Sequence, residues 1–339
     1  MKSSRVSRAL PCLWFLLADP LSAQTGPVRI VQTSAAGDDV HLIDPGTNRV
    51  VDVIRGIPIP HGVTSAPDGS ALYFSNEVDR TLDVVPTDRL AVAARIPLTG
   101  RPNNVAITPD GRKVYVAIRG GAFVDVVDVG AQRVVKSIPT LSGVHNVYVT
   151  PDGRHAVAGM IAARTLTVID TGTDDPVWSL HFEGGVRPMA FTRNPDGSTQ
   201  RIFVQLSDYH GVVVVDFAKR VEVARVALPE LPPSRVDSDA LQGSPAHGLA
   251  VSPDGATLWS TSKPNSHVYA FSLPDLTYLG GVPVGHHPDW LTMTPDGRYL
   301  YAANAGSNDV SVVDTRAMKE IARVRVGQVP KRNHTAVLR

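Results

Sequence analysis

Cysteine is almost absent from this 339-residue sequence, and its absence removes several kinds of chemistry. The single cysteine is Cys12, so the chain has no pair for an internal disulfide bond. Thiol catalysis beyond residue 23 and covalent attachment of a c-type haem are therefore excluded. The Gly-x-Ser-x-Gly elbow, the glycine-rich phosphate loop, the His-Glu-x-x-His motif and the regular calcium loop are also missing. Binding proteins and enzymes that use histidine and carboxylate side chains remain open.

Long apolar runs and an excess of one charge are also lacking, except at the N-terminus. Residues 1–23 read as a secretory signal peptide, because basic residues precede an apolar stretch at 10–18 and Leu-Ser-Ala precedes Gln24. This stretch is too short to span a membrane, so we expect no membrane span and a periplasmic or secreted product. Removing it from 33 basic and 32 acidic residues leaves 30 and 31, a charge near −1. Such a balance, without basic runs, argues against nucleic acid as a partner.

Helical periodicity is absent after residue 25, and short apolar strands that often end in Asp recur instead. These strands lie at 39–44, 81–86, 123–128, 165–170, 211–216, 266–271 and 309–314. Pro-Asp-Gly turns occur six times, beginning at Pro67, Pro109, Pro151, Pro195, Pro253 and Pro295. The turn suits strand reversal because Pro presets φ, Asp caps the local backbone and Gly accepts a positive φ. A repeat of about 40 residues with several short strands predicts a β-propeller.

The mismatch between seven strands and six turns predicts how the ring closes. The first strand precedes every Pro-Asp-Gly turn, and an unmatched inner-strand candidate lies at 333–338. We therefore expect an all-β, seven-bladed propeller of four-stranded blades, closed by N-terminal strands that pair with the C-terminal inner strand. Residues 24–339 form a single domain in this prediction, and the protein is expected to be a monomer.

One interval between turns is longer than the others. The spacing rises from 42 residues to 58 between Pro195 and Pro253, and the excess lies at about 227–245. Long loops in compact domains are typically lids, binding loops or disordered segments. The insertion is interpreted either as a lid over the axial mouth or as an idle loop.

The repeat units resemble those of the YVTN-repeat (YncE-like) seven-bladed β-propeller family. The resemblance rests on RKVYVAIRGG at 112–121 and on RYLYAANAGSNDVSVVDTRAMKEIARVRVG at 298–327. It extends over 28–339 and is weakest in the fourth repeat. The resemblance implies an extracytoplasmic propeller but no single activity, since relatives of this shape include lactonases, antibiotic lyases, amine dehydrogenase subunits, haem-binding domains and plain binding modules.

A column of polar residues marks the predicted mouth of the axial channel. The inner strands of a propeller run in one direction, so the residues that open them meet at one rim. Six residues before each turn proline, with inserted residues allowed in the fourth repeat, the sequence has His61, Asn103, His145, Arg187, His247 and Asp289. The matching residue of the seventh blade is read as Asn333, with His334 beside it.

Two interpretations of the histidines remain open. In one, His61, His145 and His247 bind one transition metal (Cu, Zn or Fe), because three imidazoles with an open position suit these ions. Candidate additional ligands are His287, His334 and His210. Glu77 and Asp289 are then the candidate catalytic groups, as proton carriers or as supports for the ligands. In the other interpretation the imidazoles are structural and hydrogen-bond the backbone of a neighbouring blade.

Polar residues on the same rim are the candidate ligand-binding groups. They are Asn103, Arg119, Arg187, Asp208, Tyr209 and Asn304. Arg119 and Arg187 together would hold a carboxylate or a phosphate, because guanidinium groups match the geometry of those anions. The alternative for each loop member is that it is simply solvated.

Three functions are compatible with these features. The first is an exported propeller that binds a small ligand, a metal or a protein partner at the axial mouth. The second is a metal-dependent enzyme of the lactonase, lyase or oxidase type, with the three histidines of the column as ligands. The third is a subunit of a periplasmic redox complex. The sequence leaves open whether the protein is an enzyme.

Overall fold

The structure is a computed structural model that describes residues 26–236 and 244–339. The predicted signal peptide at 1–23 lies outside the described residues, and so does the middle of the predicted insertion at 227–245. The described part of that insertion includes the 3-10 helix η1 (Pro233–Arg235). In the described ranges, no helix is long and apolar enough to cross a membrane.

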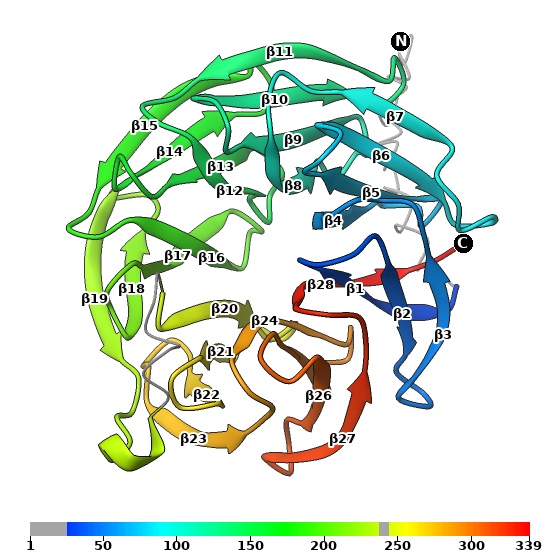
Figure 1. Ribbon diagram of the computed structural model, residues 1–339. Helices are drawn as coiled ribbons and strands as arrows, with labels where there is room; N and C mark the ends of the chain where they lie inside the picture. The colour runs from blue at the N-terminus through cyan, green and yellow to red at the C-terminus, as the bar shows by residue number, and fades with distance from the viewer. Residues whose placement is uncertain (1–25, 237–243) are drawn as a thin grey trace, which may run out of the picture.

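Seven four-stranded antiparallel sheets surround a central axis, which confirms the predicted seven-bladed propeller (Figure 1). Blade 1 consists of β4 (Pro60–Ser65), β5 (Ala71–Asn76), β6 (Thr81–Pro86) and β7 (Ala94–Pro97). Blade 2 consists of β8 (Pro102–Ile107), β9 (Lys113–Ile118), β10 (Phe123–Asp128) and β11 (Arg133–Pro139). Blade 3 consists of β12 (Val144–Val149), β13 (His155–Met160), β14 (Thr165–Asp170) and β15 (Asp175–His181).

The remaining blades follow the same order from the axis outward. Blade 4 consists of β16 (Val186–Arg193), β17 (Thr199–Leu206), β18 (Gly211–Asp216) and β19 (Val221–Ala227). Blade 5 consists of β20 (Ala246–Val251), β21 (Thr257–Ser262), β22 (His267–Ser272) and β23 (Tyr278–Pro283). Blade 6 consists of β24 (Pro288–Met293), β25 (Tyr299–Asn304), β26 (Asp309–Asp314) and β27 (Lys319–Arg325). Blade 7 consists of β28 (Pro330–Val337), β1 (Val28–Ser34), β2 (Val40–Asp44) and β3 (Arg49–Ile54).

The core lies between the blades, because each sheet packs both of its faces against its neighbours. Seven apolar clusters fill the seven junctions between adjacent blades. The third strand β18 is therefore buried along almost its whole length, whereas the outermost strand β19 alternates between exposed and half-buried positions. This explains the continuous apolar runs of the sequence, since alternation is expected only where one face of a sheet meets water.

A Thr or Ser of the repeat locks four of the six Pro-Asp-Gly turns. In blade 2 the hydroxyl of Thr108 donates to Asp110 and accepts the backbone N–H of Lys113 at 3.1 Å. Gly111 has a φ of 71°, a conformation that few other residues adopt without strain. Blades 3, 5 and 6 repeat this arrangement with Thr150, Ser252 and Thr294. The turns therefore hold each inner strand in a constant register with the second strand.

The ring closes as predicted, through β28 and β1. These strands pair antiparallel from Val28 opposite Val337 to Ser34 opposite Pro330, and the two strands lie side by side in Figure 1. One detail of the sequence interpretation is wrong. β28 begins at Pro330, which pairs with the last residue of β1. In the same way, β4 begins at Pro60, which pairs with the last residue of β5.

Lys331 rather than Asn333 is therefore the counterpart of His61 in the seventh blade. The sequence position was misassigned because β28 has no Pro-Asp-Gly turn after it from which to count back. Asn333 lies two positions deeper, where its side-chain amide donates to the carbonyl of Tyr301 at 3.0 Å.

Closure of the ring predicts the effect of substitutions in β1. Ile30 is fully buried at the junction of blades 6 and 7, so Ile30→Ala should lower the free energy of unfolding by about 2–5 kcal/mol. Val51, on the outer strand of the same blade, is 47% exposed, and Val51→Ala should change that free energy by less than about 0.5 kcal/mol. Urea unfolding measures both, and equal effects would contradict closure through β1.

Candidate functional site

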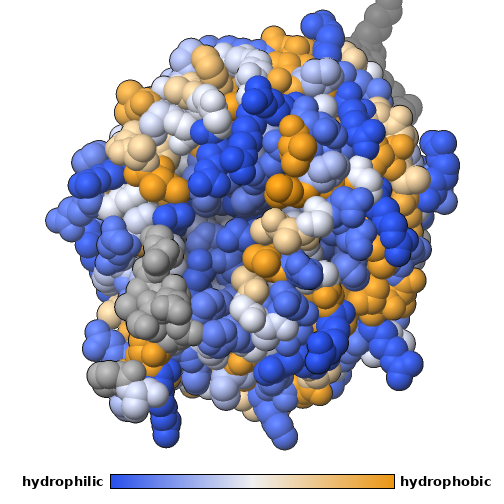
Figure 2. Space-filling view, in the orientation of Figure 1, coloured by the Kyte–Doolittle hydropathy of each residue, from blue (hydrophilic) through white to orange (hydrophobic). Residues whose placement is uncertain are grey.

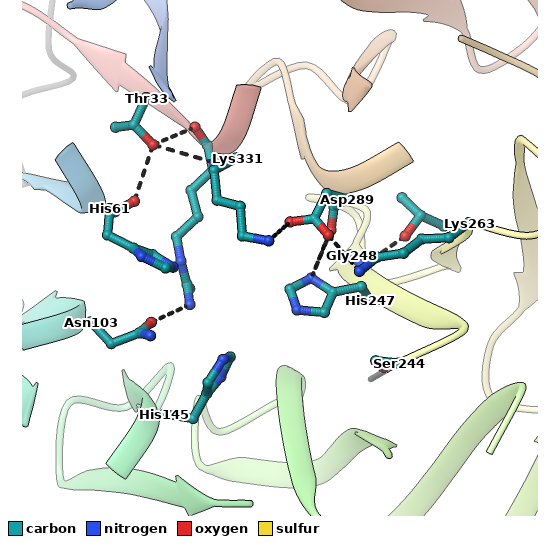
Figure 3. Close-up of polar contacts among 12 residues, drawn as sticks. Thr33, His61, Asn103, His145, Ser244, His247, Gly248, Lys263, Asp289 and Lys331 are labelled. Carbon is teal, nitrogen blue, oxygen red and sulfur yellow. Dashed lines mark hydrogen bonds and ion pairs between the residues drawn. The ribbon is translucent and has the colours of Figure 1, made fainter. Parts of the chain in front are cut away.

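The residues that open the inner strands form a polar ring at one mouth of the axial channel. The structure places six of them as the sequence predicts, each at the second position of its strand, and the seventh is Lys331. Six of the seven ring members appear together around one space in Figure 3. The face seen in Figure 2 is hollowed near its centre, and mostly hydrophilic side chains surround this hollow.

Glu77 links the first histidine of the ring to an arginine. It lies directly after β5, where its two carboxylate oxygens contact His61 Nδ1 and the guanidinium of Arg101, whose Nε donates at 2.6 Å. Burial alone would raise the pKa of Glu77, but hydrogen bonds and the positive charges lower it to about 2. Burial lowers the pKa of His61 to about 4. At neutral pH the pair is therefore an ionised carboxylate and a neutral imidazole.

This pairing fixes the tautomer of His61. A carboxylate only accepts hydrogen bonds, so Nδ1 of His61 carries the proton and Nε2 is the acceptor. Nε2 is buried and has no hydrogen-bond partner in the described part of the chain. An unprotonated imidazole nitrogen that is oriented by a buried carboxylate has the form of a general base.

His145 has the opposite tautomer. When the Asn146 amide is oriented to satisfy its neighbours, its nitrogen donates to His145 Nδ1. Its oxygen then accepts from the Arg332 guanidinium at 3.1 and 3.3 Å and from the Tyr148 hydroxyl at 3.2 Å. The Nε2 atom of His145 is therefore a donor. Burial holds the pKa of His145 well below its usual range, so this ring is also neutral.

Asp289 contacts three side chains on the other side of the channel. Its backbone carbonyl lies 2.8 Å from His247 Nδ1, and its carboxylate lies 2.7 Å from both Lys263 Nζ and Lys331 Nζ. Figure 3 shows the two lysines approaching this carboxylate from opposite sides. Burial would raise the pKa of Asp289, but His247 and the two lysines hold it well below its usual range. Asp289 is thus an ionised counter-ion of two ammonium groups rather than a group poised to carry a proton.

Arg332 is the functional candidate that the sequence interpretation missed. Its side chain is buried, its guanidinium lies 4.2 Å from the centre of the Trp290 ring, and it donates to Asn103 Oδ1 at 2.7 Å. Among the described residues no carboxylate forms an ion pair with it, and its Nε has no hydrogen-bond partner. Arg332 follows Lys331 on β28, so the correct register of this last strand would have placed it beside the polar ring.

Among residues 26–236 and 244–339, the rim contains more positive than negative charge. Arg119, Asp208 and Asp289 lie close enough to Arg187 for their charges to shift its pKa, which burial lowers. The cations around the mouth are Arg101, Arg119, Arg187, Lys263, Lys331 and Arg332. The carboxylates are Glu77, Asp208 and Asp289. Although the chain has 33 basic and 32 acidic residues in total, its described part therefore places a surplus of positive charge at this mouth.

Several sequence candidates lie apart from this constellation. Asn304 is buried within blade 6, where its amide donates to Asp309 at 2.7 Å and to Ser311 at 2.8 Å. Tyr209 packs at the junction of blades 3 and 4, with the guanidinium of Arg225 5.6 Å from its ring centre. Tyr209 lies in a loop as expected and Asn304 ends β25, but the contacts of both side chains lie within and between blades.

The three additional histidines are also occupied elsewhere. His210 Nε2 lies 2.7 Å from the hydroxyl of Ser262, and His334 Nε2 lies 2.9 Å from the hydroxyl of Ser65. His287 stacks on His286, with ring centres 4.2 Å apart. None of these contacts includes His61, His145 or His247.

The histidines of the ring do not form a ready metal centre. His145 and His247 have ring centres 6.3 Å apart, but in the described ranges no three His, Cys, Asp or Glu side chains are grouped to hold a metal ion. The Arg332 charge acts on both His61 and His145 and would repel a cation bound between them. The Cu, Zn or Fe site stays a prediction from the sequence.

This arrangement predicts the metal content of the protein. Without an affinity tag of histidines, the purified chain should contain well below one equivalent of Cu, Zn or Fe, because Arg332 is fixed among the rings. Elemental analysis by mass spectrometry measures this content. One equivalent of metal that His145→Ala removes and His181→Ala retains would contradict the expectation, since His181 is exposed on β15.

The chain has likenesses to known proteins. A family model described as lactonase, seven-bladed beta-propeller, matches residues 125–320. No curated protein sequence matches. Hydrazine synthase from Kuenenia stuttgartiensis is similar in structure, with a TM-score of 0.70, 22% identity, and coverage of 89% of this chain and 99% of that chain. A candidate 6-phosphogluconolactonase from Bacteroides fragilis has a TM-score of 0.74, 17% identity, and coverage of 94% and 100%.

A third similar structure is the dihydro-haem d1 dehydrogenase NirN in complex with DHE. Its TM-score is 0.66 at 17% identity, and the match covers 94% of this chain but only 66% of that chain. At these identities the likenesses concern the fold alone.

Proposed function

The chain belongs to the lactonase family of seven-bladed β-propellers, whose model matches more than half of its length, and on that premise we propose that its axial mouth binds a small organic anion. The anion carries a carboxylate or a phosphate group, the two groups that guanidinium side chains hold best. The surplus of cations around the mouth supports this proposal, because the field of several like charges raises the local concentration of an oppositely charged ligand.

The observation that carries the proposal is the environment of Arg332. A buried guanidinium without an ion-paired carboxylate costs free energy. Among the described residues, amides, the Tyr148 hydroxyl and the Trp290 ring contact Arg332, and the charges of Asp289 and Glu77 act on it without forming an ion pair. Arg332 Nε and the nearby Asn103 Nδ2 are buried donors without partners in the described chain. An anionic oxygen would satisfy both donors and neutralise the charge. By contrast, Arg101 and Lys331 at the mouth are already paired with the carboxylates of Glu77 and Asp289.

A second candidate function is hydrolysis of a lactone that carries this anionic group. The specific observation in its favour is the pair of Glu77 and His61, which presents an unprotonated Nε2 close to the Arg332 charge. His61 would take a proton from water as the water oxygen bonds to the ring carbonyl carbon. Arg332 would stabilise the negative charge on the carbonyl oxygen. The ring C–O bond then breaks, and the alkoxide takes the proton from His61 to give the hydroxy acid.

The family and one neighbour agree with this second candidate by name. The family is named for lactonase activity, and the Bacteroides fragilis protein is a candidate 6-phosphogluconolactonase. In this scheme His61 acts as a base instead of as a metal ligand. Glu77 acts through His61 and is therefore a positioning residue.

The other sequence predictions gain no support from the likenesses. Hydrazine synthase and the dihydro-haem d1 dehydrogenase share the fold with this chain, and a shared fold does not imply a shared reaction. A role in a redox complex, the YVTN-repeat type, export to the periplasm and the monomeric state stay predictions.

Anion binding predicts the effect of changing Arg332. Titration calorimetry with hexonic acids, hexose phosphates and their neutral parent sugars should show binding of the anions alone. Arg332→Gln should weaken it about 10–100-fold, because a hydrogen bond to a charged group contributes about 1.5–3 kcal/mol. Arg332→Lys keeps the charge and should retain part of the affinity, which separates lost charge from lost folding. Arg298→Gln is the control, since Arg298 lies on the turn at the other end of β24. Equal affinity for the neutral sugars would overturn the proposal.

Lactone hydrolysis predicts a different pattern. With glucono-δ-lactone 6-phosphate in a pH-stat, His61→Gln should lower kcat about 10²–10⁴-fold while anion binding persists. The base must be unprotonated, and the pKa of His61 is about 4. We therefore expect kcat/KM to be constant above about pH 5.5, which is about 1–2 units above this pKa, and to fall as the pH is lowered further toward the pKa. His181→Gln is the control. If His61→Gln left kcat unchanged, that result would rule out His61 as the base for hydrolysis, and the proposal of anion binding would still stand.

A further inference from the structure

Neighbouring blades touch through their Pro-Asp-Gly turns on the face opposite the mouth. At a regular junction, the glycine of one turn lies against the proline of the turn before it. A Cβ atom placed on Gly111, Gly153 or Gly297 would lie 3.2, 2.8 or 3.1 Å from a ring carbon of Pro67, Pro109 or Pro253. These short distances show that successive turns pack closely, so the turns close this face at the junctions concerned.

Blade 4 breaks this pattern on both of its sides. A Cβ atom placed on Gly197 or on Gly255 would have no heavy atom within 4 Å in the described structure. Gly197 of blade 4 therefore does not lie against Pro151 of blade 3, and Gly255 of blade 5 does not lie against Pro195 of blade 4. The hairpin of blade 4 still reaches blade 3 through the N–H of Thr199, which donates to Asp152 at 3.3 Å.

The cause lies in the hairpin of blade 4. β16 and β17 have eight residues each, whereas β20 and β21 of blade 5 have six. The pairing shifts register between Thr192 and Arg193. Asn194 also replaces the Thr or Ser that locks the regular turns, and its amide donates to Ser198 at 2.9 Å. The longer hairpin moves this turn out of the line of the others.

A cavity of about 730 Å³ lies at the open junction between blades 4 and 5. Its apolar lining includes Phe191 and the prolines of three turns and one loop, Pro151, Pro195, Pro253 and Pro274. This volume falls within the range of about 300–1,000 Å³ that is usual for ligand sites. The lining comes from the turns of three successive blades, so the cavity is a groove that crosses these turns.

Two arginines give the groove a positive charge. Arg193 is exposed, and Arg201 is half-buried, with Nη1 donating to the carbonyl of Pro274 at 3.0 Å. No carboxylate in the described ranges forms an ion pair with either arginine. Asp254 also lines the groove, but its Oδ1 accepts the Ser252 hydroxyl and the Ala256 N–H at 3.0 Å within its own turn.

The groove also contains a buried polar atom without a partner. The Thr192 side chain is 9% exposed, and its hydroxyl has no hydrogen-bond partner in the described chain. Buried polar groups are nearly always hydrogen-bonded in native proteins, so this hydroxyl is open to a partner that the described chain does not supply, either a water molecule or a bound ligand.

We propose that this groove binds an extended acidic segment of a partner protein. Carboxylates of the segment pair with Arg193 and Arg201, and an apolar side chain packs on Phe191 and the prolines. The Thr192 hydroxyl bonds the backbone of the segment. A peptide fits better than a compact small molecule because the lining spans the turns of three blades. The site is independent of the axial mouth, since inner strands begin at the mouth and end at these turns.

Selection from a random 12-residue peptide library on the full chain tests the proposal. The peptides recovered should be enriched in Asp and Glu. By fluorescence anisotropy, the double variant Arg193→Gln, Arg201→Gln should bind them at least about tenfold more weakly than the unchanged chain. The matched control is Arg112→Gln with Arg298→Gln, two exposed arginines on turns that take part in closed junctions. This control and Arg332→Gln should bind the peptides as the unchanged chain does.

Three results would overturn the proposal. They are a recovered set without acidic enrichment, peptides that bind the double variant as tightly as the unchanged chain, and free succinate that competes at the peptide's own concentration. The last result would assign the groove to a small anion. Thr192→Val provides a second test, because it should leave the thermal unfolding temperature unchanged and still weaken peptide binding. Loss of anion binding in Arg332→Gln has no bearing on these outcomes, so the two proposals fail separately.

Discussion

Circular closure is the constraint on which the mouth of this propeller depends. Thr33 of β1 shows this directly, because its hydroxyl lies 3.0 Å from the carbonyl of His61 and 3.1 Å from that of Arg332 (Figure 3). One buried side chain from the first strand thus joins the inner strands of blades 1 and 7. The pairing of β28 with β1 brings Lys331 and Arg332 to Asp289 and Asn103, although these residues are far apart in sequence. Without it the ring would be open and the cations would not converge.

The charges at the mouth are arranged so that each buried carboxylate has more than one partner. Glu77 holds Arg101 and His61, and Asp289 holds Lys263 and Lys331. Breaking a buried ion pair by removing one partner is expensive, so these carboxylates fix their cations firmly. Arg332 differs because amides, a hydroxyl and an aromatic ring surround it. Such neutral neighbours orient a guanidinium without neutralising its charge, and that charge remains available to a ligand.

The sequence predicted the fold because a propeller repeats one unit, and each repeat tests the others. The same repetition gave six members of the polar ring at their correct positions. It failed at β28, where no turn follows and the reference for counting is missing, so Asn333 replaced Lys331 and Arg332 went unnoticed. It also misjudged Asn304 and Tyr209, because a position at the end of a strand or in a loop does not fix the direction of a side chain. Asn304 turns into blade 6, and Tyr209 into the packing between blades.

The irregular spacing of blade 4 was visible in the sequence, but its consequence was not. A longer hairpin has a local effect because the bulges in β16 absorb the extra residues. Arg187 therefore keeps its place at the mouth, while at the other end the close glycine–proline contacts with both neighbouring turns are lost. The starts of the inner strands determine one face of the ring, and the turns determine the other. A change confined to one turn can therefore create a surface on the second face without disturbing the charges on the first.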